Sequence, residues 1–401
     1  MQPNNLTALD FEDVKASIKS YLRTRSEFTD YDFDGSALSY MIDMLAYNTY
    51  YSAFNANMSL NEAFLPSSTV RDNVVNIAKL MNYTPRSVIS ARASLKLDVQ
   101  TVQTNGVYPS TITLRKGASC TGGNYVWNVL RDTTVEVSPT TGIGTFADLC
   151  VYEGSLVTFQ YVVNTFARQE YTIPSAEADI NTLNVSVKAT ETATASDIYN
   201  RVDTVTTLTA ATRAYFLSEG EDMRFQVKFG DDSVGRALKD GEVVVLEYLV
   251  TSGKAANEVK TFNFIGSITD SQSVTYAAQA TTLTVNHRAQ LGSDAESIES
   301  IKYNAPRFYS SQYRAVTAQD YALITQRIYN NADSVVAYGG DSLNPPIYGK
   351  VFIAIKTKTG SLLNDATKKE IAADLRKYAM ASIDPVAVSY THLTLPTNRE
   401  V

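Results

Sequence analysis

The stretch GSALSYMIDMLAYNTYYSAFNANMSLNEAF, residues 35–64, decides the fold of the first part of the chain. Its apolar residues recur at intervals of three and four, which predicts one long amphipathic helix. We expect this helix to begin at Asp34–Ser36 and to stop at Pro66, because proline lacks the backbone N–H that a helix interior needs. One face of the helix carries Leu38, Met41, Ile42 and Leu45.

Four aromatic residues widen the apolar surface of this predicted helix. They are Tyr47, Tyr50, Tyr51 and Phe54. A helical hairpin with rings on several faces cannot bury all of them within itself, so these four residues are the candidate partner interface. Coiled helical contacts with a partner would bury them. The alternative is that the rings pack inside the subunit's own hairpin.

Further helices are predicted on both sides of this stretch. Behind a polar start at Thr7 and Asp10, helical spacing is kept by Phe11, Val14, Ile18 and Leu22. After Pro66, the segment SSTVRDNVVNIAKLMNY holds in register Val70, Val74, Ile77 and Met81. Residues 1–88 are therefore predicted to be a helical, partner-binding segment.

From about Ala91 the apolar period changes from helical to two. Segments such as ASLKLDVQTV (93–102), STITLRKGASC (110–120) and SLVTFQYVV (155–163) alternate apolar and polar residues between Gly, Asn and Pro turns. This pattern predicts a β-rich body over residues 89–290.

The last part of the chain mixes helix and strand signals. TAQDYALITQRI is predicted to be a helix capped by Thr317, with Asp320 at its third position. YGKVFIAIKTKTG predicts a strand, and NDATKKEIAADLRKYAMAS predicts a helix with Ile371, Leu375 and Tyr378 on one side. Residues 291–387 are therefore expected to form an incomplete mixed α/β domain, and the whole chain belongs to the α+β multidomain class.

The composition excludes several classes of function. The net charge is −7, from 35 basic and 42 acidic residues, which argues against nucleic acid as a partner because phosphate binding needs basic patches. The two cysteines, Cys120 and Cys150, are too few for a disulfide framework and fit a reducing compartment. Neither a signal peptide nor a membrane-spanning run is expected, so membrane insertion is excluded.

One motif resembles the opening of a calcium-binding loop. DYDFDG places Asp30, Asp32 and Asp34 before Gly35, but the twelfth position, where such a loop needs a glutamate, is Met41. We therefore interpret the motif as a polar turn whose carboxylates cap the next helix, and we expect no metal.

Two other features could suggest catalysis. FGDDSVGRALKDGE, residues 229–242, brings Asp231, Asp232 and Arg236 close together, but glycines at its bends favour a hairpin connection between two strands. His287 has no cysteine or second native histidine nearby and is interpreted as structural. The sequence thus predicts no catalytic residues and no cofactor.

Residues 32–87 closely resemble the N-terminal region of the large baseplate wedge subunit of T-even-type contractile-tailed phages. The resemblance rests on GSALSYMIDMLAYNTYY, NMSLNEAFL, VRDNVV and MNYTPRS. Three later blocks are similar to the wider baseplate J-like family and follow in family order. They are FGDDSVGRALKDGEVVVLEYLVTSGKAANEV, SIESIKYNAPRFYSSQYRAVTAQDY and YGKVFIAIKT.

This resemblance implies a structural role rather than an enzymatic one. Such subunits associate with copies of themselves and with other wedge proteins in a ring around a central hub, so the expected location is the virion tail baseplate, assembled in the host cytoplasm. Two other functions remain open. The chain could be a β-rich receptor-binding or adhesin-like tail protein, or a cell-envelope polymer hydrolase using Asp231 and Asp232.

The closing stretch VSYTHLTLPT, within residues 388–401, is similar to the in-frame translation of a transposase adaptor used in sequencing libraries. We therefore expect residues 388–401 to be an artefact, residues 389–401 to pack poorly on the body, and the native sequence to end near Ala387 or Val388. On this interpretation the chain is a C-terminally truncated fragment, His392 is not native, and a region that the family uses for self-association is missing.

Overall fold

The chain forms two compact units. The first comprises Met1–Asn82 with Ile298–Tyr303, and the second comprises Tyr83–Ser297 with Asn304–Val401. The computed structural model describes residues 10–28, 33, 36–104, 106–202, 208–277, 281–312, 314–329, 332–357, 363 and 365–389. The helices are α1 (Phe11–Arg23), α2 (Ala37–Glu62), α3 (Arg71–Leu80), α4 (Ile298–Ser311), α5 (Ala318–Ile328) and α6 (Asp365–Arg376).

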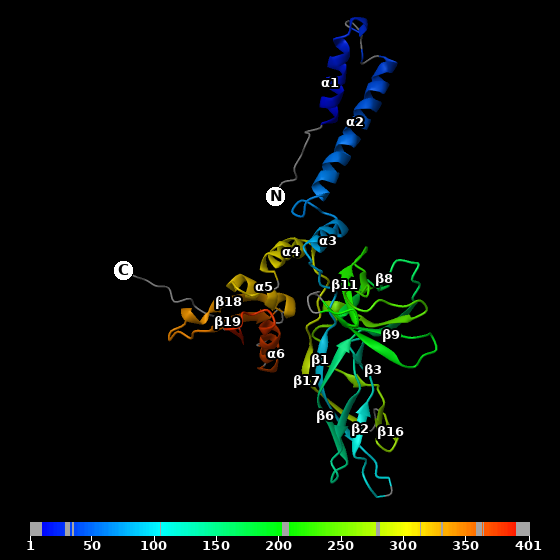
Figure 1. Ribbon diagram of the computed structural model, residues 1–401, viewed down its shortest axis with the longest axis vertical. Helices are drawn as coiled ribbons and strands as arrows, with labels where there is room; N and C mark the ends of the chain where they lie inside the picture. The colour runs from blue at the N-terminus through cyan, green and yellow to red at the C-terminus, as the bar shows by residue number, and fades with distance from the viewer. Residues whose placement is uncertain are drawn as a thin grey trace. The chain divides into compact units, whose positions relative to one another are not determined.

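The first unit is built on a helical hairpin, as predicted. Asp10 is the N-cap of α1 and accepts a hydrogen bond from the Glu12 backbone N–H at 2.9 Å. Helix α1 lies beside α2 (Figure 1), and Lys15 Nζ pairs with Asp43 Oδ1 at 2.6 Å between them. Helix α2 starts after Ser36, in agreement with the prediction, but it ends at Glu62, before Pro66.

The early end of α2 is explained by the side chain of Glu62, which turns the chain into α3. Its carboxylate accepts hydrogen bonds from Ser68 Oγ at 2.6 Å, from Thr69 N and Oγ1 at 2.8 and 2.7 Å, from Val70 N at 3.2 Å and from Asn73 Nδ2 at 2.9 Å. Val70, the N-cap of α3, makes no side-chain cap. The Glu62 carboxylate therefore takes the place of a cap and faces the positive end of the helix dipole.

The turn between α2 and α3, which the Glu62 carboxylate holds and which we call the Glu62 corner, is expected to open as the pH falls. Partial burial raises the pKa of Glu62, but the hydrogen bonds from Asn73, Ser68 and Thr69 outweigh it and hold the pKa far below the ordinary value of 4.5. The stabilisation is therefore complete above about pH 5 and is lost as the pH falls towards the folded-state pKa. At pH 7, Glu62→Gln should weaken the corner by about 1–2 kcal/mol.

Hydrogen exchange of the Thr69 and Val70 amides measures this local stability. The wild type should lose protection between pH 5 and pH 3 relative to Glu62→Gln, after correction for the intrinsic pH dependence of exchange. Equal protection in both proteins at every pH would show that the ionised Glu62 carboxylate does not stabilise the start of α3.

The second unit contains the β-rich body and a smaller mixed α/β part. Its strands are β1 (Arg92–Gln100), β2 (Thr111–Leu114), β3 (Gly117–Gly122), β4 (Tyr125–Val129), β5 (Thr133–Glu136), β6 (Ile143–Glu153), β7 (Ser155–Val162), β8 (Glu170–Thr172), β9 (Ala178–Lys188), β10 (Ser196–Arg201), β11 (Ala214–Glu219), β12 (Phe225–Phe229), β13 (Val243–Val250), β14 (Asn263–Phe264), β15 (Ile268–Asp270), β16 (Thr275–Tyr276), β17 (Thr281–Gln290), β18 (Ala332–Gly339), β19 (Lys350–Thr357) and β20 (Asp384–Ser389). They make sheets in the orders β14-β3-β4-β6-β1-β17, β7-β13-β9-β10-β11-β12-β8, β16-β15-β2-β5 and β18-β19-β20.

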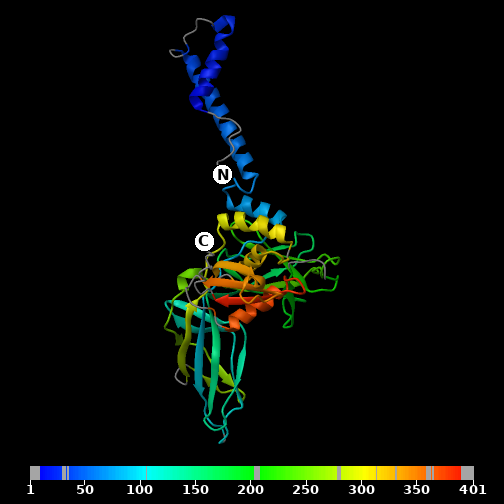
Figure 2. The same ribbon diagram turned by 90° about the vertical axis from the view of Figure 1, so that its left-hand side faces the viewer.

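The first sheet confirms the alternation predicted for the body. Strand β1 buries every second residue, and its long antiparallel neighbours β6 and β17 lie on either side of it (Figure 2). Leu95 and Leu97 are fully buried with Trp127, the one tryptophan of the chain. The indole Nε1 donates to the Gly122 carbonyl at 3.1 Å, so the polar edge of this large ring is satisfied inside the core.

The connection between β12 and β13 corrects a prediction. Residues 229–242 were expected to join two paired strands as a hairpin, but β9, β10 and β11 lie between β12 and β13 in the sheet. The segment is a crossing connection rather than a hairpin. Glycine turns are compatible with both arrangements, and only the distant partners of each strand decide between them.

The mixed α/β part packs α5 and α6 with the sheet β18-β19-β20. Thr317 and Asp320 form the predicted capping box of α5. On α6, Ile371 and Leu375 are buried as predicted, whereas Tyr378 lies past the end of the helix at Arg376 and is partly buried. Together with the helical hairpin and the β-rich body, this part gives the chain the predicted α+β multidomain fold.

Two of the last fourteen residues lie in a strand. Val388 and Ser389 belong to β20, where they pair in parallel with Ala354 and Ile355 of β19. Residues 390–401 lie outside the described part of the chain. Among the described helices, none has both the length and the apolar character needed to cross a bilayer.

Candidate partner interface

The four aromatic residues predicted as an interface lie on two faces of α2. Tyr47, Tyr51 and Phe54 are exposed by 56%, 47% and 53%. Tyr50 is partly buried, one helical step away. The rings of Tyr47 and Tyr51 are 4.6 Å apart between centroids, and Tyr50 meets Tyr51 edge to face at 6.0 Å. The exposed trio shares one face of α2, and Tyr50 lies on another.

The exposed trio belongs to a longer apolar line that runs along α2. The side chains of this line are 47–76% exposed and alternate at intervals of four and three residues. We call this line the α2 seam, and its members are Tyr40, Met44, Tyr47, Tyr51, Phe54 and Met58. Alternating intervals of four and three residues are the heptad spacing at which the core positions of a coiled coil face a partner helix.

Sequence reasoning found the middle of the seam and missed its ends. Tyr40, Met44 and Met58 were not among the predicted interface residues. The signal that could have found them is the heptad spacing itself, since each lies three or four positions from another member.

Helix α1 covers a different face of α2. The buried α2 residues Ile42 and Ala46 lie away from the seam, whereas the ion-paired Asp43 lies at its edge, four residues before Tyr47. Moreover, α1 has 13 residues and α2 has 26, so at the α-helical rise they are about 20 and 39 Å long. A helix half as long cannot cover the whole of α2, and because α1 packs on another face it leaves the seam exposed from Tyr40 to Met58.

The seam carries no charge at physiological pH. The only acidic residues on α2 are Asp43 and Glu62, and neither belongs to the seam. A hydrogen bond with Tyr51 raises the pKa of Tyr47 further above its ordinary value of 10, so the phenol stays neutral. The driving force available to this surface is therefore apolar burial.

The acids considered for catalysis have structural roles. Asp231 Oδ1 accepts hydrogen bonds from the backbone N–H groups of Ser233 and Val234 at 3.0 and 2.9 Å, and these bonds lower its pKa. Asp232 Oδ1 accepts from Ala237 N at 2.8 Å. Arg236 donates to Tyr199 and forms an ion pair with Glu242. A carboxyl group whose pKa is lowered is not poised to act as a general acid.

The structure describes His287 and both cysteines, but it does not describe the calcium-like motif. The described residues contain no group of His, Cys, Asp and Glu side chains that could hold a metal ion. The calcium-like motif at Asp30, Asp32, Asp34 and Gly35 lies outside the described residues. His287 is exposed on β17 opposite Ser94. Both cysteines are free thiols.

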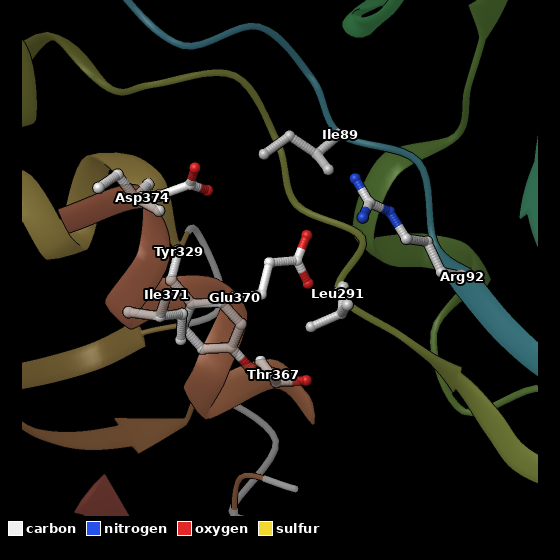
Figure 3. A pocket seen from close by; sticks show the side chains of 9 residues that line it. Ile89, Arg92, Leu291, Tyr329, Thr367, Glu370, Ile371 and Asp374 are labelled. Atoms are coloured by element: carbon white, nitrogen blue, oxygen red, sulfur yellow. The ribbon is translucent and has the colours of Figure 1, made fainter. Parts of the chain in front are cut away.

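A cavity of about 150 Å³ lies in the second unit between the start of β1 and α6. Figure 3 shows Arg92 on one side and Glu370 and Asp374 on the other, with the guanidinium pointing towards the carboxylates. The Arg92 guanidinium also lies 5.0 Å from the Tyr152 ring centroid. The cavity therefore brings one basic and two acidic side chains together.

Two regions of the chain match protein-family models. Residues 10–83, which span α1 to α3, match the family model for the baseplate wedge protein gp6-like helical domain. Residues 317–388, from the cap of α5 into β20, match the model for the baseplate structural protein gp6, C-terminal domain I.

Two individual proteins are similar to the chain over most of its length. The baseplate wedge protein gp6 of Enterobacteria phage T4 is 25% identical over 421 aligned residues, which cover 98% of this chain and 60% of that protein. A solved chain from the 6-fold symmetrised cryo-EM structure of the anti-feeding prophage baseplate covers 96% of this chain and 74% of its own length. Its identity is 11% and its TM-score 0.32, too low to support an inference about fold.

The chain spans 60% of the length of its curated relative, so the comparison covers part of a larger protein. The two family matches coincide with folded parts of the structure, the α1–α3 region and the α5–β20 region. Two regions of the chain therefore match family models of gp6-type baseplate wedge proteins, residues 10–83 the helical domain and residues 317–388 the C-terminal domain I.

Proposed function

We propose that this protein is a structural component of a phage tail baseplate wedge and not an enzyme. It assembles in the host cytoplasm with a second copy of itself and with other wedge proteins, and it resides in the ring around the hub of the virion tail. The observation that carries the proposal is the α2 seam, an uncharged apolar line left exposed on a helix of the family's wedge domain.

The role of the seam follows from the cost of exposing it to water. Tyr40 is 76% exposed and Met44 is 73% exposed, and their neighbours along the seam continue the line for five helical turns. Soluble monomers rarely expose an apolar surface of this continuity, whereas helices that pair expose it until the partner is bound. Residues 1–88 therefore act as the partner-binding segment, and the trio Tyr47, Tyr51 and Phe54 forms its centre.

The composition of the seam also suits more than one partner. Tyr and Phe supply large contact areas with few rotatable bonds, and Met44 and Met58 have flexible thioether side chains that adapt to different neighbours. A second copy of α2 and a helix from another wedge protein can both pack on such a line. Tyr50, which is partly buried beside the seam, contributes less to the partner contact.

The oligomeric state of the purified chain tests the proposal. Light scattering across about 1–50 μM should show self-association, and co-expression with a neighbouring wedge protein should yield a complex that survives gel filtration. The association should depend weakly on salt, because the seam is uncharged. The decisive version of this test uses the full-length protein: if that protein stays monomeric at the highest concentration and does not co-purify with wedge proteins, the assembly role is refuted.

A further inference from the structure

A second, smaller pocket in the second unit is lined by three arginines. Its volume is about 90 Å³. Arg86 comes from the segment that precedes β1, Arg201 ends β10, and Arg327 lies in the last turn of α5. None of the residues that line the pocket is Asp or Glu. Three separate parts of the chain thus bring positive charge to one small cavity, in a protein whose net charge is −7.

Arg327 has a donor that is buried without an acceptor. Its guanidinium lies over the ring of Phe308 at 4.2 Å from the centroid and at 5.8 Å from the Tyr83 ring. Stacking fixes the plane of the group, and Nη1 is buried with no hydrogen-bond partner among the described residues. A buried N–H without an acceptor is unfavourable, and none of the described residues provides an acceptor for this one.

Two carboxylates close to the pocket have donors of their own. Glu296 Oε2 forms an ion pair with Arg86 Nε at 3.9 Å, and the carboxylate accepts hydrogen bonds from Arg86 N, the Tyr83 hydroxyl and Asn304 Nδ2. Asp179 accepts from Ser90 and Asn181. The lining itself holds no carboxylate that could accept from Arg327.

We propose that this pocket binds one small oxyanion group, a carboxylate or a phosphate. Arg327 donates to it through its fixed guanidinium, and Arg86 and Arg201 supply the surrounding positive potential. A planar guanidinium fork is the protein group best matched to two oxygens of a carboxylate or phosphate. The volume admits one such group and is too small for a nucleotide. The group could be an acidic side chain of a partner protein or a free inorganic ion, and both sources share this chemistry.

Direct titration of the full chain tests the proposal. The probes are sodium phosphate and the peptide acetyl-Gly-Glu-Gly-amide, each added at constant ionic strength maintained with sodium chloride. Calorimetry should detect one site, and either probe should raise the Tm. Arg327→Met keeps the stacked aliphatic volume but removes the donors, so the affinity should fall at least tenfold. Arg327→Lys keeps the charge but not the planar guanidinium fork, so its affinity should lie between those of the wild type and Arg327→Met.

The matched control is Arg168→Met, which removes the same charge from a side chain that is 83% exposed and lies away from the pocket. It should bind as the wild type does. Tighter binding of the peptide identifies a partner's carboxylate as the source, and tighter binding of phosphate identifies a free ion. The proposal is overturned if neither probe binds the wild type, or if Arg168→Met weakens binding as much as Arg327→Met. Because the wild-type titration decides by itself, a variant that fails to fold leaves the test intact.

Discussion

Replacing Tyr51 and Phe54 together by alanine is expected to weaken assembly of this protein at least 100-fold. Both rings are about half exposed in the subunit and lie at the centre of the α2 seam, where aromatic residues contribute most to binding. A 100-fold loss corresponds to about 2.8 kcal/mol, or about 1.4 kcal/mol for each ring. Sedimentation or light scattering at several concentrations measures the change in the association constant.

The matched control is Met41→Ala with Leu45→Ala. These side chains are 61% and 55% exposed on the same helix, but they lie about 100–140° around its axis from the seam. Assembly should change less than tenfold in this variant, and the helical content should match that of Tyr51→Ala/Phe54→Ala. Equal losses in the two variants would mean that the contact is not centred on the seam.

Tyr50→Ala separates the seam from the rest of the predicted interface. Because Tyr50 is already partly buried in the subunit, its loss should act on the hairpin rather than on the partner. Its effect on assembly is expected to be smaller than that of Phe54→Ala alone.

Replacing Glu296 by alanine is expected to destabilise the second unit by about 3 kcal/mol. The Glu296 side chain is buried, and its carboxylate accepts from the Tyr83 hydroxyl at 2.8 and 3.0 Å, from Arg86 N at 3.1 Å and from Asn304 Nδ2 at 3.0 Å. Burial, and then the adjacent Glu296 charge, raise the pKa of Tyr83, so the phenol remains a donor. Removing the common acceptor leaves several buried donors unpaired, which costs more than the net value of the bonds.

Urea denaturation followed by Trp127 fluorescence reports on the second unit, because the only tryptophan of the chain lies in its core. Tyr83→Phe removes one donor and leaves the acceptor satisfied by the others, so it should cost only about 1 kcal/mol. A denaturation midpoint in Glu296→Ala equal to that of Tyr83→Phe would show that the carboxylate does not organise this cluster.

Local patterns in the sequence predicted most of the secondary structure. The capping box of α5 needs only Thr317 and Asp320, three residues apart, and the alternation of β1 is visible within nine residues. The helix start at Ser36 was predictable for the same reason. The end of α2 was not, because it depends on the Glu62 carboxylate reaching donors as far along the chain as Asn73.

The sequence by itself determined the elements, their apolar faces and the resemblance to the baseplate wedge family, because each of these resides in neighbouring residues. Only the tertiary structure decided which apolar face stays exposed, since the heptad spacing of the α2 seam is the same whether or not another helix covers it. It also decided that β12 and β13 are not paired, and that Arg86, Arg201 and Arg327 meet at one pocket. These features depend on contacts between residues far apart in the chain, which no local pattern specifies.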